Sequence, residues 1–315
     1  MKRAVFIILA AVVCLQAGAQ TASSLFWKKD GKQVTEIVSE QPVQYKYVGH
    51  HGPAVENGYF ALRIYFNDSG AIDVYSKSGK QMELLRYGWY PSEEQQAAEG
   101  AGCDEYRVGS TIGAGGIALW DGEKEVKLAA KSRTARVGKT VDGSYAEIIA
   151  YGVEYKGSTV DISIRVDMAD GSRFATITGS EINGKEVMFL TGVNYFEGGI
   201  ADYGEGWIAA WGVHPPDVSK DPGPVGVGMR FNPADFSAPE KTGDMVRIIS
   251  KPSSSIRTMV TCASVKEDEI NTAEKLIAAV SSGHCASGHC SSERCASGCR
   301  RANSCCTNQT KNTLK

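Results

Sequence analysis

The chain has 315 residues, 35 of them glycine, and a formal net charge of −2. Residues 1–19 and 283–315 are both net positive, so residues 20–282 carry a net charge of −8. Nucleic-acid binding requires a basic face that neutralises phosphates, and an acidic chain argues against nucleic acid as the partner. It also disfavours a long polyanion unless a local basic groove exists.

Residues 1–19 are predicted to be a cleavable signal peptide. Two basic residues precede an apolar run that ends at Leu15 and is shorter than the roughly 20 residues that span a bilayer. Ala17-Gly18-Ala19 then fits a signal peptidase. We therefore expect cleavage after Ala19 and a periplasmic or secreted protein that does not span the membrane. The alternatives are a membrane anchor or a lipoprotein attached through Cys14.

Alternation of apolar and polar residues predicts antiparallel β-structure in most of residues 20–282. Residues 59–66 and 161–167 show it most clearly, and each is expected to have one buried and one open face. Further strands are predicted at 71–76, 106–109, 115–120, 125–129, 145–151, 187–196, 206–211, 225–230 and 257–263. Turn signals separate them, and Asp170-Gly171 and Asn183-Gly184 predict hairpins.

Helix is scarce in the sequence. Pro91 to Gly100 can form a short helix, and Asn271 to Ala279 can form a last one with a capping box made by Asn271 and Glu274. The predicted fold class is all-β, a large antiparallel two-sheet β-sandwich with a short C-terminal helix, formed by residues 20–282 as a single domain.

Residues 283–315 contain six of the nine cysteines and a single large aliphatic residue. Such a segment buries too little apolar surface to offset the entropy of ordering. Three interpretations stay open: zinc binding, disulfide pairing, and a disordered or mistranslated tail. Within residues 20–282, Cys103 and Cys262 could form one bridge.

The densest group of reactive side chains begins on a loop at His50-His51 and continues into the strand of residues 59–66. Aromatic residues beside glycine or proline form a second group near residues 87–107, and His214 lies in a proline-bounded loop. The predicted catalytic residues are His51, Glu56, Arg63, Tyr65 and His214. The predicted substrate-binding residues are His50, Asn57, Tyr87, Trp89, Tyr90, Tyr106 and Arg107.

Each of these residues also has a structural interpretation. The two histidines could be turn residues bonded to backbone, Arg63 a cross-strand partner, and Trp207 and Trp211 part of the core. Metal binding by His50, His51 and His214 is possible, but the sequence fixes no distance between them. We expect no cofactor.

The strings GPAVENGYFALRIYFNDSGAIDVYSK, LRYGWYPSEEQ and GCDEYRVGSTIGAGGIALWDGEK resemble an exported domain-of-unknown-function family encoded in bacterial polysaccharide-utilisation gene clusters. The resemblance covers residues 40 to 282. It implies a galactose-mutarotase-like β-supersandwich and a role in glycan metabolism, with an oligosaccharide or polysaccharide as the partner. It implies no mechanism.

The expected function is β-elimination on an oligosaccharide that contains uronic acid. Arg63 would neutralise the uronate carboxylate, His51 or Tyr65 would take the C5 proton, and Glu56 or His214 would assist the leaving oxygen. The first alternative is hydrolysis or epimerisation, with Glu56 and Asp104 as a carboxylate pair. The second is a glycan-binding protein that uses Tyr87, Trp89 and Tyr90 for stacking and changes no bond.

Overall fold

The computed structural model describes residues 20–40, 44–88, 90–217 and 219–282, all of which belong to one compact unit. The predicted signal peptide, Trp89 and the cysteine-rich segment 283–315 lie outside the described residues.

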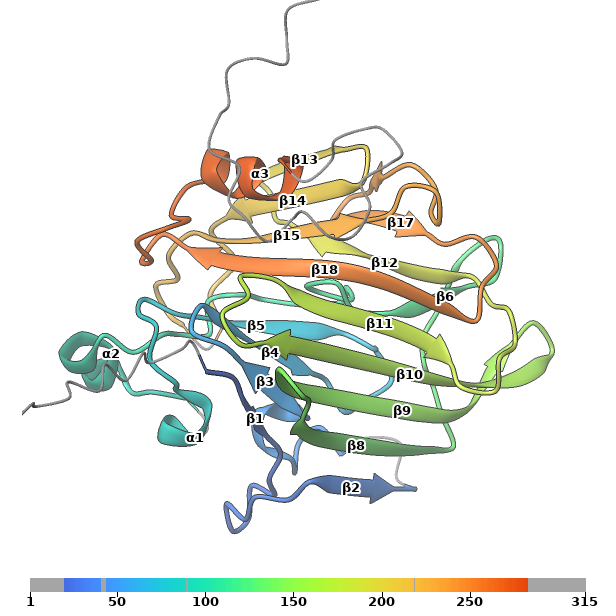
Figure 1. The fold of residues 1–315 in the computed structure, drawn as a ribbon, viewed down its shortest axis with the longest axis horizontal. Coiled ribbons are helices and arrows are strands. Elements are labelled where there is room, and N and C mark those ends of the chain that lie inside the picture. The colour runs from blue at the N-terminus through green and yellow to red at the C-terminus, as the bar shows by residue number, and fades with distance from the viewer. Residues whose placement is uncertain (1–19, 41–43, 89, 218, 283–315) are drawn as a thin grey trace, which may run out of the picture. The chain divides into compact units, whose positions relative to one another are not determined.

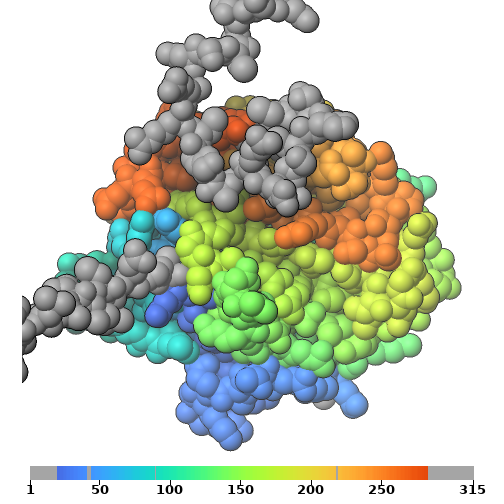
Figure 2. All heavy atoms as spheres, in the orientation of Figure 1, coloured from blue at the N-terminus to red at the C-terminus, as the bar shows by residue number. Residues whose placement is uncertain are grey.

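One layer of the fold is a nine-stranded antiparallel sheet (Figure 1). In spatial order its strands are β13 (Ile200–Gly204), β14 (Trp207–Gly212), β15 (Val225–Phe231), β18 (Ser255–Ser264), β11 (Ala175–Glu181), β10 (Ser158–Ala169), β9 (Gly143–Tyr155), β8 (Ser132–Lys139) and β2 (Glu36–Ser39). Lys156 and Gly157 both have positive φ in the tight turn that joins β9 to β10, as a primed hairpin turn requires. Figure 2 shows the outer side of β8 to β11 in green.

Two smaller antiparallel sheets lie against the nine-stranded sheet. The first contains β1 (Ala22–Ser24), β3 (Ala54–Glu56), β4 (Phe60–Ile64) and β5 (Ile72–Ser76). The second contains β16 (Glu240–Lys241), β17 (Met245–Ile249), β12 (Phe189–Asn194), β6 (Ala118–Trp120) and β7 (Glu125–Val126). Gly113 bridges to Ile72 and Ala114 bridges to Val193, so the two sheets continue into each other as the second layer of a β-sandwich.

The apolar core lies between the two layers. Leu62 and Val74 from the four-stranded sheet, Phe189 from β12, and Ile164 and Val260 from the nine-stranded sheet are fully buried in one cluster. Burial of this continuous apolar surface is the main stabilising contribution to the fold.

The helices are short. They are η1 (Gly49–His51), a 3-10 turn, α1 (Leu84–Tyr87), α2 (Glu93–Glu99) and α3 (Ala273–Ser281). Helix α2 has a capping box formed by Ser92 and Gln95. Helix α3 packs Leu276 and Val280 against β14 and β15, but its N-cap is Thr272, one residue beyond the predicted Asn271.

The structure confirms the all-β sandwich and the last helix, corrects three local predictions, and decides the open question of a bridge between Cys103 and Cys262. Residues 106–109 form no strand. Asn183-Gly184 joins β11 to β12, which belong to different sheets, so it makes no hairpin, whereas Asp170-Gly171 joins the paired strands β10 and β11. Strand β4 is buried on both faces because other segments cover its outer side. Cys103 and Cys262 are both buried free thiols.

Candidate active-site pocket

A pocket of about 560 Å³ opens beside the four-stranded sheet. Its walls come from the loop before β3, from Tyr65 directly after β4, from Asp73 of β5, from Tyr90, from the irregular segment 104–110 and from the loop after β14. The lining side chains used below are Tyr45, His51, Tyr65, Asp73, Tyr90, Asp104, Tyr106 and Arg107.

The register of the four-stranded sheet brings its charged side chains together. Arg63 pairs across the strands with Asp73 on one side and Ala54 on the other. These residues point to the outer face, because Leu62 and Val74, one position away, point into the core.

Arg63 is held by two carboxylates. Its Nη2 atom lies 2.5 Å from Asp73 Oδ2 and 2.8 Å from Asp104 Oδ1, and its side chain is 1% exposed. The guanidinium also faces the ring of Tyr90 at 5.4 Å. The expectation of an arginine on an open face is therefore wrong. Arg63 lies beneath the pocket and fixes the two acidic side chains that line it.

Asp73 combines burial with several polar contacts. Burial raises the pKa of its carboxyl to about 7; the charge of Asp104 adds to this, and the charge of Arg63 opposes it. Its Oδ1 atom accepts a hydrogen bond from the Val74 amide at 2.8 Å, and its Oδ2 atom accepts one from the Tyr65 hydroxyl at 2.8 Å. Burial and the Asp73 carboxylate raise the pKa of Tyr65 far above its ordinary value, so its hydroxyl keeps its proton.

His51 stacks on Tyr45 at a centroid distance of 3.9 Å and meets the edge of Tyr65 at 5.8 Å. Its Nδ1 atom lies 3.3 Å from the carbonyl oxygen of Tyr45. Because a carbonyl only accepts, this bond requires the proton on Nδ1 and places the lone pair of the neutral ring on Nε2. Burial lowers the pKa of His51 to about 4, so the ring is neutral at pH 7.

Another wall contains Tyr106, and the buried ring of His214 packs on it at a centroid distance of 4.4 Å. The Nδ1 atom of His214 accepts a hydrogen bond from the Arg107 amide at 3.0 Å, and burial lowers the pKa of this histidine to about 4. The Tyr106 hydroxyl bonds to Asn194. The Arg107 side chain, by contrast, is 44% exposed at the rim, where its Nε lies 4.0 Å from Asp217.

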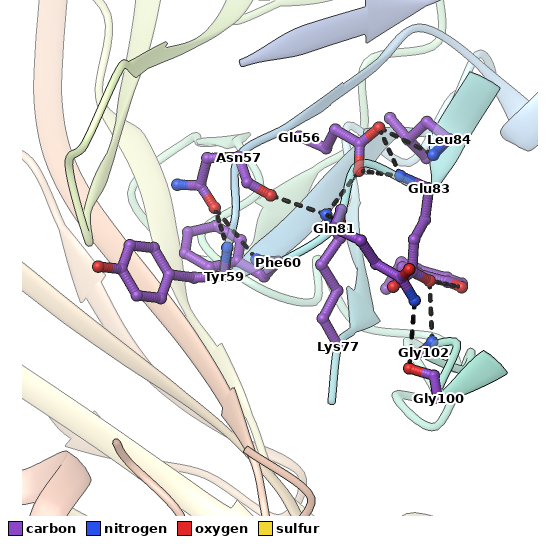
Figure 3. A network of polar contacts seen from close by, with 11 residues as sticks. Glu56, Asn57, Tyr59, Phe60, Lys77, Gln81, Glu83, Leu84, Gly100 and Gly102 are labelled. Carbon is purple, nitrogen blue, oxygen red and sulfur yellow. Dashed lines mark hydrogen bonds and ion pairs between the residues drawn. The ribbon is translucent and has the colours of Figure 1, made fainter. Parts of the chain in front are cut away.

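Six predicted site residues do not line the pocket. Arg63 and His214 contact lining residues from behind, and the other four lie elsewhere. Glu56 is buried in an ion pair with Lys77 and accepts hydrogen bonds from the amides of Glu83 and Leu84 (Figure 3). Asn57 accepts from the amides of Tyr59 and Phe60, and so shapes the turn before β4.

His50 is buried with its ring edge against Phe26, and burial lowers its pKa to about 3. Tyr87 bonds to the Glu99 carboxylate on the surface of the α1–α2 region.

The pocket also contains residues that the sequence patterns did not identify. Asp73 stands between Ile72 and Val74 in a buried strand, and an acidic residue at such a position was a usable signal. Tyr45 had no such signal in the sequence. No nearby pattern predicts that residues 44–51 lie over the end of β4.

No cluster of three or more histidine, cysteine, aspartate or glutamate side chains in the described residues could hold a metal ion. The helices of the described segments are all too short or too polar to cross a membrane.

These features define a β-sandwich protein with a polar pocket lined by tyrosine, histidine and paired carboxylates. The sequence model of the family described as a domain of unknown function, DUF4861, matches residues 11–282, and the chain belongs to this family. No curated protein matches the chain.

Among solved structures, the chain is similar to the 4-alpha-glucanotransferase from Thermococcus litoralis, with 10% sequence identity and a TM-score of 0.34. The similarity covers 67% of this chain but only 39% of the glucanotransferase chain.

Proposed function

We propose that this protein is an exported carbohydrate-active enzyme that cleaves an oligosaccharide containing uronic acid by β-elimination. The observation that carries the proposal is that His51, Tyr65 and Arg107 line one pocket. Together they supply a neutral base, a protonated hydroxyl and an accessible cation. Elimination requires these three functions, and it requires no nucleophile.

His51 is the base in this scheme. A neutral imidazole with its lone pair on Nε2 can take the proton from C5 of the uronate, and the Nδ1 bond to the Tyr45 carbonyl holds the ring in that tautomer. The electron pair of the C5–H bond forms the C4–C5 double bond, and the C4–O bond breaks.

Tyr65 is the acid. Its strongly raised pKa keeps the hydroxyl protonated, so Tyr65 is not available as a base but has a proton to donate to the departing oxygen. Asp73, bonded to the Tyr65 hydroxyl, can return a proton to Tyr65 when it is itself protonated. This division of roles replaces the expectation that Glu56 or His214 assists the leaving group.

Arg107 binds the uronate carboxylate. Removal of the C5 proton builds negative charge next to that carboxylate, and a guanidinium group can bind it through two parallel hydrogen bonds. Arg63 cannot take this role while its Nη2 atom is engaged by Asp73 and Asp104. Tyr45 and Tyr90 offer aromatic surfaces to the apolar faces of sugar rings.

The test is incubation of the purified protein with a panel of uronate oligosaccharides, monitored for the ultraviolet absorbance of the C4–C5 double bond. The expected result is absorbance with the native protein and a loss of about 10²-fold or more with His51→Ala. Arg136→Ala removes an exposed arginine of β8 that pairs with Glu36 of β2, and it should leave the rate unchanged. No absorbance with any uronate would refute elimination.

A second candidate is glycoside hydrolysis, favoured by the pairing of Asp73 with Asp104. Both carboxylates contact the same nitrogen of Arg63, at 2.5 and 2.8 Å, so these two oxygens cannot be further apart than the sum of those distances. Retaining glycosidases place their carboxylates about 5–5.5 Å apart. New reducing ends without ultraviolet absorbance would select hydrolysis. Binding that survives His51→Ala, without any product, would select a glycan-binding protein.

A further inference from the structure

A second concave surface, distinct from the pocket, lies on the two segments 27–29 and 44–47. It is a groove of about 470 Å³, lined by Trp27, Lys28, Lys29, Gln44, Lys46 and Tyr47. We call it the basic groove. The loop between β1 and β2, which carries the first of these segments, lies beside the edge strand β2 at the blue end of the chain (Figures 1 and 2).

Backbone pairing holds the basic groove in place. Trp27 and Val48 form an antiparallel bridge, and the Lys28 amide donates to the Tyr47 carbonyl at 2.9 Å. The Gly31 amide donates to the Trp27 carbonyl at 2.9 Å, and the Tyr47 amide donates to the Gln44 carbonyl at 2.9 Å, so each segment turns tightly. One side of Trp27 packs against the core, whereas Tyr47 is 63% exposed.

The charge of the basic groove is opposite to that of the protein as a whole. Among the described residues its lining contains three lysines and no carboxylate, although residues 20–282 have a net charge of −8. Asp30, the acidic residue closest in sequence, has its Oδ1 atom bonded to the Lys32 amide at 3.0 Å. The exposed lysines Lys29 and Lys46, beside an indole and a phenol, therefore form a local binding surface for a ligand with negative charges and flat apolar faces.

The basic groove and the pocket share a wall. Gln44, Lys46 and Tyr47 line the groove, while Tyr45 and His51 line the pocket. The segment 44–51 therefore contributes to both concave surfaces.

We propose that the basic groove is a second binding site for an acidic polysaccharide, in which Lys29 and Lys46 bind sugar carboxylates and Trp27 and Tyr47 stack on sugar rings. Alternating carboxylates and pyranose faces match this combination of lysines and aromatic rings. The choice of glycan rests on the proposed function, but the existence of the site does not depend on catalysis.

Affinity electrophoresis of the full chain in gels containing polygalacturonate, with an uncharged galactan as the comparison, tests this site without any turnover. Lys29→Glu/Lys46→Glu should lower the affinity for polygalacturonate about tenfold or more, and Tyr47→Ala should lower it severalfold. Trp27→Ala should act in the same direction, but Tyr47→Ala is the safer variant because Trp27 contacts the core. The same gels run at rising salt should show weaker retardation.

The matched control is Lys124→Glu/Lys251→Glu, which makes the same charge change at two exposed lysines on other parts of the surface. If this control pair loses as much affinity for polygalacturonate as the Lys29/Lys46 variant, the effect is one of net charge and the proposed site is wrong. The site is also wrong if the Lys29/Lys46 variant is retarded as strongly as the native protein. Tighter binding to single-stranded DNA or to vesicles of anionic phospholipid than to polygalacturonate would also overturn it. His51→Ala should still be retarded by polygalacturonate. If it is, while the native protein forms no unsaturated product, the proposed function fails and the groove stands.

Discussion

Two ionic clusters lie on the same outer face of the four-stranded sheet, and they differ in what covers them. In one, Arg63 joins Asp73 and Asp104 at the wall of the pocket. In the other, Lys77 joins Glu56, and Glu83 lies beside them with its Oε2 atom bonded to the Tyr75 hydroxyl at 2.5 Å (Figure 3). The register separates the clusters by only two residues along each strand.

The cover makes the difference. Leu84 of α1 packs on Ala54, Ala61 and Tyr75, and the Gly102 amide binds Glu83, so the segment 83–102 closes over the Lys77 cluster. Lys77 then satisfies its charge internally, with further bonds to the carbonyls of Asn57 at 2.8 Å and Gln81 at 2.7 Å. Similar residue types on one sheet face are therefore sealed from solvent at one end and line a pocket at the other.

Lys77→Met should break this comparison most severely, because it leaves Glu56 buried beside no cation. Removal of one partner of a buried ion pair costs about 3–5 kcal/mol, and we expect a loss of unfolding free energy in that range by urea denaturation. Lys80→Met, which removes an exposed lysine paired with Glu269, should cost about 1 kcal/mol or less. Equal losses in the two variants would mean that the sealed cluster is not structural.

Tyr65→Phe should lower activity strongly and stability only a little, the reverse of what we expect for Lys77→Met. It removes the proposed acid at the pocket and one hydrogen bond to Asp73, so kcat should fall about 10²-fold or more while stability falls by about 1 kcal/mol. Tyr87→Phe removes a hydroxyl of the same kind outside the pocket and should change neither quantity by much. A Tyr65→Phe enzyme with native kcat would remove Tyr65 from the mechanism.

The sequence predicts β4 and β5 well, because alternation depends only on neighbouring residues, but it did not predict β3, which carries Glu56. It identified Arg63 as a charged residue in β4, but it placed that residue on an open face. Glu56 and Asp104 looked equivalent as candidate carboxylates. What separates them is the segment 83–102 and the loop 104–110, whose positions depend on contacts between residues far apart in the chain. For the same reason residues 106–109, which have the pattern of a strand, instead form a wall whose carbonyls bind Asn194.

The pH dependence of kcat/KM should sharpen the contrast within the pocket. His51 acts when neutral, so the rate should rise with pH through the pKa of about 4. Asp73 acts when protonated, because it returns the proton to Tyr65, so the rate should fall as pH rises through about 7. In Asp73→Asn the lower rate should no longer fall above pH 7, since the amide has no proton to lose there. If kcat/KM still falls above pH 7 in Asp73→Asn, a group other than Asp73 causes that decrease.

Arg107→Ala should have the smallest effect of these changes, since Arg107 is the most exposed of the proposed functional groups. A partly solvated charge contact with the uronate carboxylate is worth about 1.5 kcal/mol, so KM should rise about tenfold with stability unchanged. Arg107→Lys should recover part of this loss, because it restores the charge but not the two parallel bonds of a guanidinium group. If the rise in KM also appears for a substrate whose carboxylate is esterified, Arg107 contacts another part of the sugar. The pocket then does not select uronates through this residue.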